Sequence, residues 1–420
     1  MSSKGAGAVS GEQDRQGGLV PKLRFPEFRD AEGWNPVPLS RTCQPINEKV
    51  GRVNLTPVSI TAGLGFVSQA SKFGRDISGD QYKNYTHLRF GDFAYNKGNS
   101  KKYPQGYVCQ LKEFEEAAAS SAFICFRLKP EHEPAFFQAA FDQNLHGRQL
   151  SKYITSGARS DGLLNIRPDA FYSVDIPIPP TPAEQKKIAD CLLSIDALIA
   201  AEAEKLEALK DHKKGLMQQL FPAPGETTPR LRFPEFQDAG EWEEKEVGDV
   251  FTVTRGNVLA MTLVNDVPTD RKPYPVYSSQ TKRAGLAGYY SDFLYEDAIT
   301  WTTDGANAGD VNYRAGKFYC TNVCGVLISR EGYANPCVAA IINSVSKSHV
   351  SYVGNPKLMN GVMAKIVIPL PSVEEQTKIA FLLTSVDTLI AEQDDKVATL
   401  KAHKNGLMQH LFPSQDKIDV

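Results

Sequence analysis

The feature that most constrains this 420-residue chain is an internal repeat. Residues 22–28 (KLRFPEF) recur as residues 230–236 (RLRFPEF), a shift of 208 positions. Residues 185–222 recur as residues 376–413, a shift of 191 positions, with 22 identities in 38 aligned positions. Each copy therefore has a short opening motif, a body and a long closing segment, and the second body is 17 residues shorter than the first. Such a chain is expected to fold into two related halves.

The closing segments are predicted to be long helices that carry a narrow apolar stripe. Each begins after a capping-box pattern, at Thr181 and Ser372, and each ends at a Phe-Pro pair. A helix of about 38 residues is about 57 Å long. The stripe advances by alternating steps of four and three residues, which is typical of a coiled coil. It consists of Ile188, Leu192, Ile195, Ile199, Leu206, Leu209 and Leu216 in the first copy, and of Ile379, Leu383, Val386, Ile390, Val397, Leu400 and Leu407 in the second.

Each stripe is too narrow to bury itself, so we expect the two helices to pair antiparallel in one coiled coil. The alternative is that they are long core helices. Polar residues interrupt both stripes at the same steps, at Glu202 and Gln393 and at Lys213 and Lys404. Such residues often set the register of a coiled coil, and we predict that role for these four.

The bodies are predicted to mix helices and strands. Residues 122–128 and 326–328 have the composition of buried strands, residues 136–150 that of a helix, and Gly63 to Gly65 that of a turn. The expected fold class is α+β, with two pseudo-symmetric α/β domains joined by two long antiparallel coiled-coil helices. The expected divisions are a flexible tail at 1–20, a first domain at 21–180, a central helix at 181–222, a second domain at 223–371, a C-terminal helix at 372–413 and a tail at 414–420.

Composition excludes several classes of protein. No run of about 18 apolar residues suggests a membrane span, and the first twenty residues lack the apolar stretch of a secretory signal. Seven cysteines without a CxxC pair favour free thiols in the cytoplasm. For Cys320 and Cys324 we expect buried thiols rather than a metal site. The net charge of −2 does not indicate nucleic acid, although residues 41–129 hold 13 Lys and Arg against 7 Asp and Glu.

The motifs of common enzyme sites are missing from the sequence. There is no GxxxxGK[ST] loop, no Asn-Pro-Pro-aromatic or Asp-Pro-Pro-aromatic sequence and no GxSxG elbow. His212 and His403 repeat, but each lies beside a lysine in a charged helical segment and is expected to be an exposed helix residue. We therefore expect no catalytic residue, no metal and no cofactor on this chain.

With these features in place, the chain resembles the specificity subunits of type I restriction-modification systems. The resemblance extends over about residues 21–413 and rests on KLRFPEF, IPIPPTPAEQKKIA and GLMQQLFP. Four body segments also look like parts of such subunits: YNKGNSKKYPQGY from Tyr95, SGARSDGLLNI from Ser156, YPVYSSQTKRAGLAGYY from Tyr274 and ITWTTDGANAGDV from Ile299.

The resemblance implies that each body is a target-recognition domain for one half of a split, asymmetric DNA sequence. It implies that the helices space the domains and dock two modification subunits, which bind S-adenosylmethionine and methylate adenine. It also implies a restriction subunit that couples ATP to translocation and cleavage. Two other functions stay open, namely a protein-binding adaptor that does not read DNA and an enzyme with an unfamiliar site.

Base-contacting residues vary with the target in this family, so we select candidates by chemistry. Asn, Gln, Arg and Lys suit base edges, whereas Ser, Thr and Lys suit phosphates. For each residue, a loop position away from DNA is the alternative. The candidates are Lys97, Asn99, Ser100, Lys101, Lys102, Tyr103 and Arg159 in the first domain, and Ser278, Gln280, Thr281, Lys282, Thr303, Asp304 and Asn307 in the second.

Overall fold

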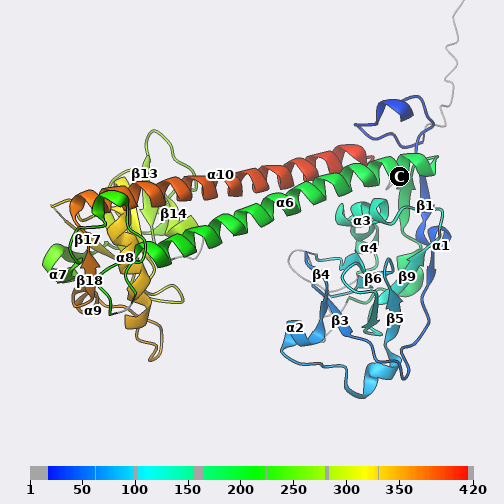
Figure 1. Ribbon diagram of the computed structural model, residues 1–420. Coiled ribbons are helices and arrows are strands. Elements are labelled where there is room, and N and C mark those ends of the chain that lie inside the picture. The colour runs from blue at the N-terminus through cyan, green and yellow to red at the C-terminus, as the bar shows by residue number, and fades with distance from the viewer. Residues whose placement is uncertain are drawn as a thin grey trace, which may run out of the picture. The chain divides into compact units, whose positions relative to one another are not determined.

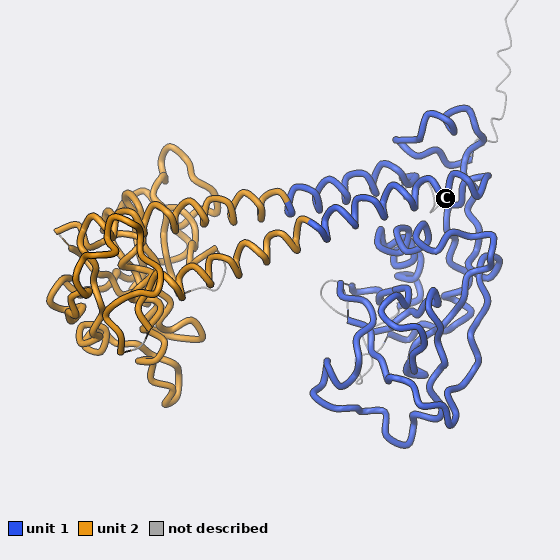
Figure 2. Tube along the Cα trace, in the orientation of Figure 1, with its two compact units in different colours: residues 1–201, 397–420 blue, residues 202–396 orange. Residues whose placement is uncertain are grey.

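The computed structural model describes residues 18–61, 63–98, 103–154, 164–223, 225–279, 283–329 and 331–414. The chain divides into two compact units (Figure 2). Unit 1 comprises residues 1–201 and 397–420, and unit 2 comprises residues 202–396. Within the described residues, no helix is both long enough and apolar enough to cross a membrane.

Two helices of 39 residues, α6 (Pro182–Leu220) and α10 (Val373–Leu411), are labelled in Figure 1, and each contributes to both units (Figure 2). In unit 1, Ile188 and Leu192 near the start of α6 share a core with Met408 and Leu411 near the end of α10. In unit 2 the ends are exchanged, because Leu220 of α6 packs in one core with Ile379 and Leu383 of α10. The predicted antiparallel pairing is therefore confirmed in each unit.

The opening motif joins the start of one long helix to the end of the other. In unit 1, Arg24 donates to both carboxylate oxygens of Glu184 at 2.7 Å, and the Leu23 amide donates to the His410 carbonyl at 2.9 Å. In unit 2, Arg232 donates to Glu375 at 2.7 Å, and the Leu231 amide donates to the Gln219 carbonyl at 2.9 Å. The PEF residues form a 3-10 turn in both copies, η1 (Pro26–Phe28) and η3 (Pro234–Phe236).

These contacts correct the predicted capping boxes. Ser372 does act as a cap, since its hydroxyl accepts from the Glu375 amide at 3.3 Å. The carboxylates of Glu184 and Glu375 bind the arginines of the opening motifs instead of returning to the start of the helix. The repeated glutamates therefore serve tertiary structure more than helix capping.

Unit 1 contains two four-stranded sheets, in the orders β2-β9-β6-β7 and β4-β3-β8-β5, and the small sheet β1-β10. The phenylalanine-rich helix α3 and helices α4 and α5 contribute to the main core together with both long helices. The strands are β1 (Asn35–Pro38), β2 (Cys43–Pro45), β3 (Pro57–Thr61), β4 (Gly65–Ser68), β5 (Thr86–Arg89), β6 (Phe93–Asn96), β7 (Tyr107–Gln110), β8 (Glu116–Ala119), β9 (Ile124–Leu128) and β10 (Asp175–Ile178), and the helices are α1 (Leu39–Thr42), α2 (Gln69–Phe73), α3 (Pro134–Asp142), α4 (Leu145–Ser151) and α5 (Pro168–Tyr172).

Unit 2 contains one six-stranded sheet, in the order β12-β17-β15-β16-β13-β14, and the small sheet β11-β18. Helix α8 packs on the sheet with the long helices, and Trp301 and Ile342 lie in the shared core. The strands are β11 (Glu243–Glu246), β12 (Thr252–Arg255), β13 (Tyr274–Tyr277), β14 (Leu286–Tyr290), β15 (Tyr295–Thr302), β16 (Val311–Cys320), β17 (Cys324–Ile328) and β18 (Val367–Leu370), and the helices are α7 (Val247–Val250), α8 (Pro336–Ser346) and α9 (Asn360–Ala364).

The two units share one strand topology. In unit 1 the antiparallel run β2-β9-β6-β7 matches β12-β17-β15-β16 of unit 2. The parallel pair β3-β8 matches β13-β16. Unit 2 keeps β15 and β16 continuous across a bulge at Asp297, which has a φ of 44° and accepts from the Gly316 amide at 2.7 Å. The sequence repeat is therefore also a repeat of fold.

One predicted helix is divided in two. Residues 136–150 were expected to form a single helix, but α3 ends at Asp142 and α4 begins at Leu145. Asn144 lies between them with a φ of 58°, and its amide donates to the Phe141 carbonyl at 2.8 Å. Asparagine tolerates this left-handed conformation better than most residues, so it ends the first helix and redirects the second. The strand and turn predictions for residues 122–128, 326–328 and 63–65 are confirmed.

Candidate nucleic-acid interface

Eight of the fourteen candidate DNA-contacting residues lie outside the described residues: Asn99, Ser100, Lys101, Lys102, Arg159, Gln280, Thr281 and Lys282. Lys97, Tyr103, Ser278, Thr303, Asp304 and Asn307 are described. The described residues at the ends of these segments show where each segment joins the fold.

In unit 1, described residues close in sequence to the two candidate segments contact each other. Lys97 follows β6 directly, and its carbonyl accepts from the amide of Leu164 at 2.9 Å. Lys97 and Leu164 therefore lie side by side, although they are far apart in the sequence. Tyr103 is half-buried, and its ring centroid lies 4.6 Å from that of Tyr107.

Part of the basic excess in the first body is neutralised by the fold. Arg89 donates to both oxygens of Glu48 at 2.7 and 2.8 Å, and Arg127 donates to Asp92 at 2.6 and 2.8 Å. The hydrogen bonds that Arg127 donates to Asp92 raise the pKa of Arg127. These two arginines therefore support the sheets.

In unit 2, Ser278 and Asn307 come from different candidate segments and line one small polar pocket of about 50 Å³. The Ser278 hydroxyl accepts from Thr321 Oγ1 at 3.0 Å, and its amide donates to the Gly285 carbonyl at 2.8 Å. Asp304 lies nearby in sequence and 3.7 Å from the ammonium group of Lys357. The structure therefore brings the two predicted segments together.

Thr303 has a different environment. It is buried, and its hydroxyl lies 2.8 Å from Asp304 Oδ2 and 3.0 Å from the Val323 carbonyl. Its amide also donates to Val323. Thr303 therefore supports its loop from inside the unit, and Asp304 and Asn307 are the more accessible members of this segment.

Arg314, which is not among the residues predicted from the sequence, lines the same pocket. It lies on β16, donates from Nε to Thr300 Oγ1 at 2.9 Å, and places its guanidinium carbon 3.7 Å from the centroid of the Tyr277 ring. The only sequence signal was an arginine inside a strand otherwise rich in aromatic and small residues.

The stripe residues lie on the paired faces of the long helices, with burial greatest toward the helix starts. Ile188, Leu192, Leu206, Ile379, Leu383, Val386 and Val397 are buried, whereas Ile195, Ile199, Leu209, Leu216, Ile390, Leu400 and Leu407 are half-buried.

The four polar stripe residues all bond to the opposite helix. Gln393 Nε2 donates to the carbonyl and the carboxylate of Glu202 at 2.8 and 2.7 Å. Hydrogen bonds from Gln393 and from Lys396 lower the pKa of Glu202. Lys213 binds Asp387 at 2.6 Å in unit 2, and Lys404 binds Asp196 at 2.6 Å in unit 1. The last two contacts occupy equivalent positions of the repeat, which supports a role in register.

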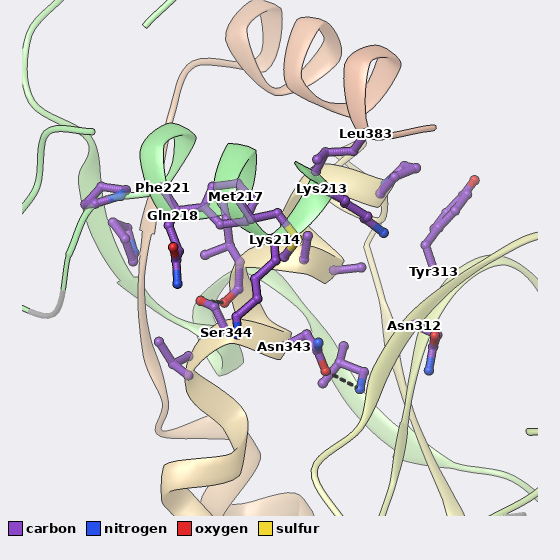
Figure 3. A pocket seen from close by; sticks show the side chains of 18 of the residues that line it. Lys213, Lys214, Met217, Gln218, Phe221, Asn312, Tyr313, Asn343, Ser344 and Leu383 are labelled. Atoms are coloured by element: carbon purple, nitrogen blue, oxygen red, sulfur yellow. Dashed lines mark hydrogen bonds between the residues drawn. The ribbon is translucent and has the colours of Figure 1, made fainter. Parts of the chain in front are cut away.

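A groove of about 1020 Å³ lies beside the end of α6 in unit 2. Figure 3 shows Lys213, Lys214, Met217 and Gln218 of α6 on one side of it and Asn343 and Ser344 of α8 on the other. A smaller cavity of about 360 Å³ lies beside Phe412 and Pro413 in unit 1, at the equivalent end of α10. Neither is lined by any of the six candidate DNA residues that the structure describes.

Groups suited to metal binding are not gathered in the described part of the chain. It contains no cluster of three or more His, Cys, Asp or Glu side chains placed to hold a metal ion. All seven cysteines are unpaired, and burial raises the pKa of Cys324 to about 11. Cys320 and Cys324 are buried thiols, as expected.

The sequence matches the family model for the type I restriction modification DNA specificity domain twice, over residues 60–211 and 239–401. Among curated relatives, the MpnORF289P type I specificity subunit N-terminus of Mycoplasma pneumoniae is 36% identical over 33% of this chain and 74% of its own length. The MjaX type I specificity subunit of Methanocaldococcus jannaschii is 25% identical over 88% of this chain and 87% of its own. The chain spans about half the length of several other relatives, including 44% of the MpnII specificity subunit of M. pneumoniae.

Two solved structures have the same fold over most of the chain. The S subunit of a type I restriction-modification system from M. genitalium has a TM-score of 0.59 and 16% identity, covering 94% of this chain and all of its own. A chain from a study of complex assembly in a type I R-M system has a TM-score of 0.50 and 17% identity, covering 91% of this chain and 98% of its own.

Proposed function

The chain belongs to the family of type I restriction-modification DNA specificity subunits, which is not a catalytic family, and we propose that its two units each read one half of a bipartite, asymmetric DNA target. The observation that carries this proposal is a repeated frame around two unlike bodies. The opening motifs and long helices have the same contacts in both units. The bodies share a strand topology but differ in length and loop sequence. Loops on a constant scaffold are where binding specificity usually resides.

The partners follow from the same family role. The long helices dock two modification subunits, which bind S-adenosylmethionine and methylate adenine, and restriction subunits add ATP-driven cleavage. We place the assembly in the cytoplasm, where the DNA lies. On the helices, Leu198 and Leu389 occupy equivalent repeat positions and are 46% and 51% exposed. A repeated exposed leucine is a suitable contact for two copies of one partner.

The decisive experiment exchanges one body. Residues 41–175 are replaced by the corresponding body of a related specificity subunit, and the methylome of the resulting strain is sequenced. We expect one half of the methylated sequence to change while the other half and the spacer stay the same. The reciprocal exchange in unit 2 is the matched control. A change in both halves, or in neither, contradicts independent reading by the two units.

Point substitutions separate phosphate contacts from base contacts. Lys101→Ala and Lys102→Ala are expected to weaken binding to all sequences and to reduce the salt slope by about one unit each. Asn99→Ala and Gln280→Ala are expected to cost about 1–3 kcal/mol and to relax discrimination in one half-site only. Uniform loss from all four would contradict the assignment.

The docking proposal is tested by Leu198→Glu combined with Leu389→Glu. We expect the double variant to fold but to lose the modification subunits in size-exclusion chromatography. Leu193→Glu is the control, because Leu193 is 43% exposed but has a threonine at the equivalent position. A protein-binding adaptor without DNA readout would assemble normally yet retain DNA without sequence preference.

A further inference from the structure

Arg314 is a buried cation that has no carboxylate partner in the described part of the chain. Its residue is 9% exposed. Nε donates to Thr300 Oγ1 at 2.9 Å and Nη2 donates to the Ala284 carbonyl at 2.7 Å, so both acceptors are neutral. Among the described residues, no Asp or Glu forms an ion pair with Arg314. Asp310, the one acid in the pocket lining, is paired with Lys347 at 2.8 Å.

Such an environment is unfavourable for a charge unless an anion joins it. Burial lowers the pKa of Arg314, because the charged form has lost part of its hydration. Two neutral acceptors and the face of Tyr277 recover only part of that loss. The guanidinium therefore favours a negatively charged group that enters the pocket from outside the chain.

The pocket has the size and the lining of an oxyanion site. Its volume of about 50 Å³ is well below the roughly 300 Å³ at which sites for whole small molecules begin. It holds a group of a few atoms, such as a phosphate, rather than a nucleobase. Ser278, Asn307 and Asn312 add hydroxyl and amide groups to the lining, which are common partners of phosphate oxygens in protein–DNA contacts.

The backbone beside the pocket is closely packed and locally left-handed. Gly285 has a φ of 87°, and a Cβ at this position would lie 2.7 Å from the Ser278 carbonyl oxygen. Ala284 also has a positive φ of 50°, and its carbonyl is held by Arg314. Arg314 thus fixes the backbone at Ala284.

We propose that this Arg314 pocket binds one phosphate of the DNA backbone in the half-site read by unit 2. The inference rests on the proposed DNA-reading function and adds the group that is bound and its position. The pocket is lined by Ser278 and Asn307, one from each predicted recognition segment. A phosphate held here orients both segments toward the bases without reading sequence itself.

The test uses the complex assembled with its modification subunits and duplexes that carry one neutral methylphosphonate, moved along the second half-site. With the wild-type complex we expect one position to weaken binding about tenfold or more, because a hydrogen bond to a charged group is lost. With Arg314→Gln, binding is already weakened, and the methylphosphonate at that position has little further effect. Arg314→Lys keeps the charge and is expected to restore part of the difference.

A second pocket variant and a phosphate titration test the assignment without relying on Arg314→Gln alone. Asn312→Ala changes the pocket lining and keeps Arg314. We expect it to weaken DNA binding and to reduce the effect of the methylphosphonate at the same position of the duplex. Inorganic phosphate alone, titrated against the wild-type complex, distinguishes a free-anion site. Suppose that inorganic phosphate binds the wild-type complex but not Arg314→Gln, and that no methylphosphonate position has a smaller effect in Arg314→Gln than in wild type. The pocket then binds a free anion, and the DNA-phosphate assignment is overturned.

Two further outcomes distinguish phosphate binding by the Arg314 pocket from the proposed DNA-reading function. Sequence-selective binding by the wild-type complex without coupling between Arg314 and any phosphate overturns the inference and leaves the proposed function intact. Failure of the wild-type complex to prefer any DNA sequence overturns both.

Discussion

The buried ion pair between Arg24 of the opening motif and Glu184 of α6 allows a sharp test of what stabilises the contact between the motif and the long helices. Arg24→Met removes the guanidinium from Glu184, whose side chain is 1% exposed. The same guanidinium also donates to the carbonyls of Ala31 at 2.7 Å and Glu32 at 2.9 Å. The substitution therefore leaves a buried carboxylate and two backbone acceptors without their donor.

The expected loss is large because one charge stays buried without its partner. Breaking a buried ion pair from one side typically costs about 3–5 kcal/mol. The equivalent substitution in unit 2, Arg232→Met, is expected to cost more. In unit 1 the Trp34 indole still donates to Glu184 at 3.1 Å. In unit 2 the Trp242 indole nitrogen is buried without a partner among the described residues. The difference should approach one hydrogen bond to a charged group, about 1.5–3 kcal/mol.

Hydrogen exchange measured by mass spectrometry is the appropriate assay, because it reports opening of each unit separately. Amides in the first turns of α6 should lose protection in Arg24→Met, and those of α10 in Arg232→Met. Lys187→Met is the matched control, since Lys187 pairs with Glu27 of the same motif at 3.0 Å but both side chains are about half exposed. It should change protection very little. Combining Arg24→Met with Glu184→Leu should recover most of the loss.

Equal, small effects of Arg24→Met and Lys187→Met would refute this reasoning. They would mean that the buried pair contributes no more than a surface pair, and that the apolar core around Trp34 and Phe412 holds the motif by itself.

Three further predictions concern stability. Burial lowers the pKa of His146 to about 4. The contribution of His146 to the free energy of unfolding should be fully present above the unfolded pKa of about 6.5. It should fall by roughly 3 kcal/mol as the pH drops toward 4, because only the unfolded chain takes up the proton. His146→Phe should flatten urea midpoints measured across that range, while exposed His212→Gln should not. Leu206→Ala, at a side chain 6% exposed, should cost about 2–5 kcal/mol in urea unfolding, and Leu193→Ala far less; equal losses would argue against a buried stripe. Asp387→Asn breaks a partly exposed ion pair with Lys213 and should lower the free energy of unfolding by under about 1 kcal/mol. A larger loss would mean that this pair contributes more to the register of the two long helices.

The candidate site was less predictable than the frame. The loop segments of unit 2 were identified by residue type, and the structure places Ser278 and Asn307 together as a consequence of strand order. Arg314 was not identified, because its neighbours Tyr277, Ala284 and Thr300 come from three other segments of the chain. The break between α3 and α4 was missed as well, since Asn144 adopts a left-handed conformation that its local sequence permits but does not require.

The sequence by itself determined the repeat, the two long helices, their antiparallel pairing and the polar positions along their stripes. These features follow from periodicity and from residues that recur at constant spacing. Local sequence patterns are therefore enough to predict them. The tertiary structure decided that Glu184 and Glu375 bind arginines about 150 residues away, that β15 and β16 of unit 2 each continue where unit 1 has two strands, and that a lone arginine meets a polar pocket. Those outcomes depend on which distant surfaces are buried together, and burial decides whether a charge or a polar group finds its partner.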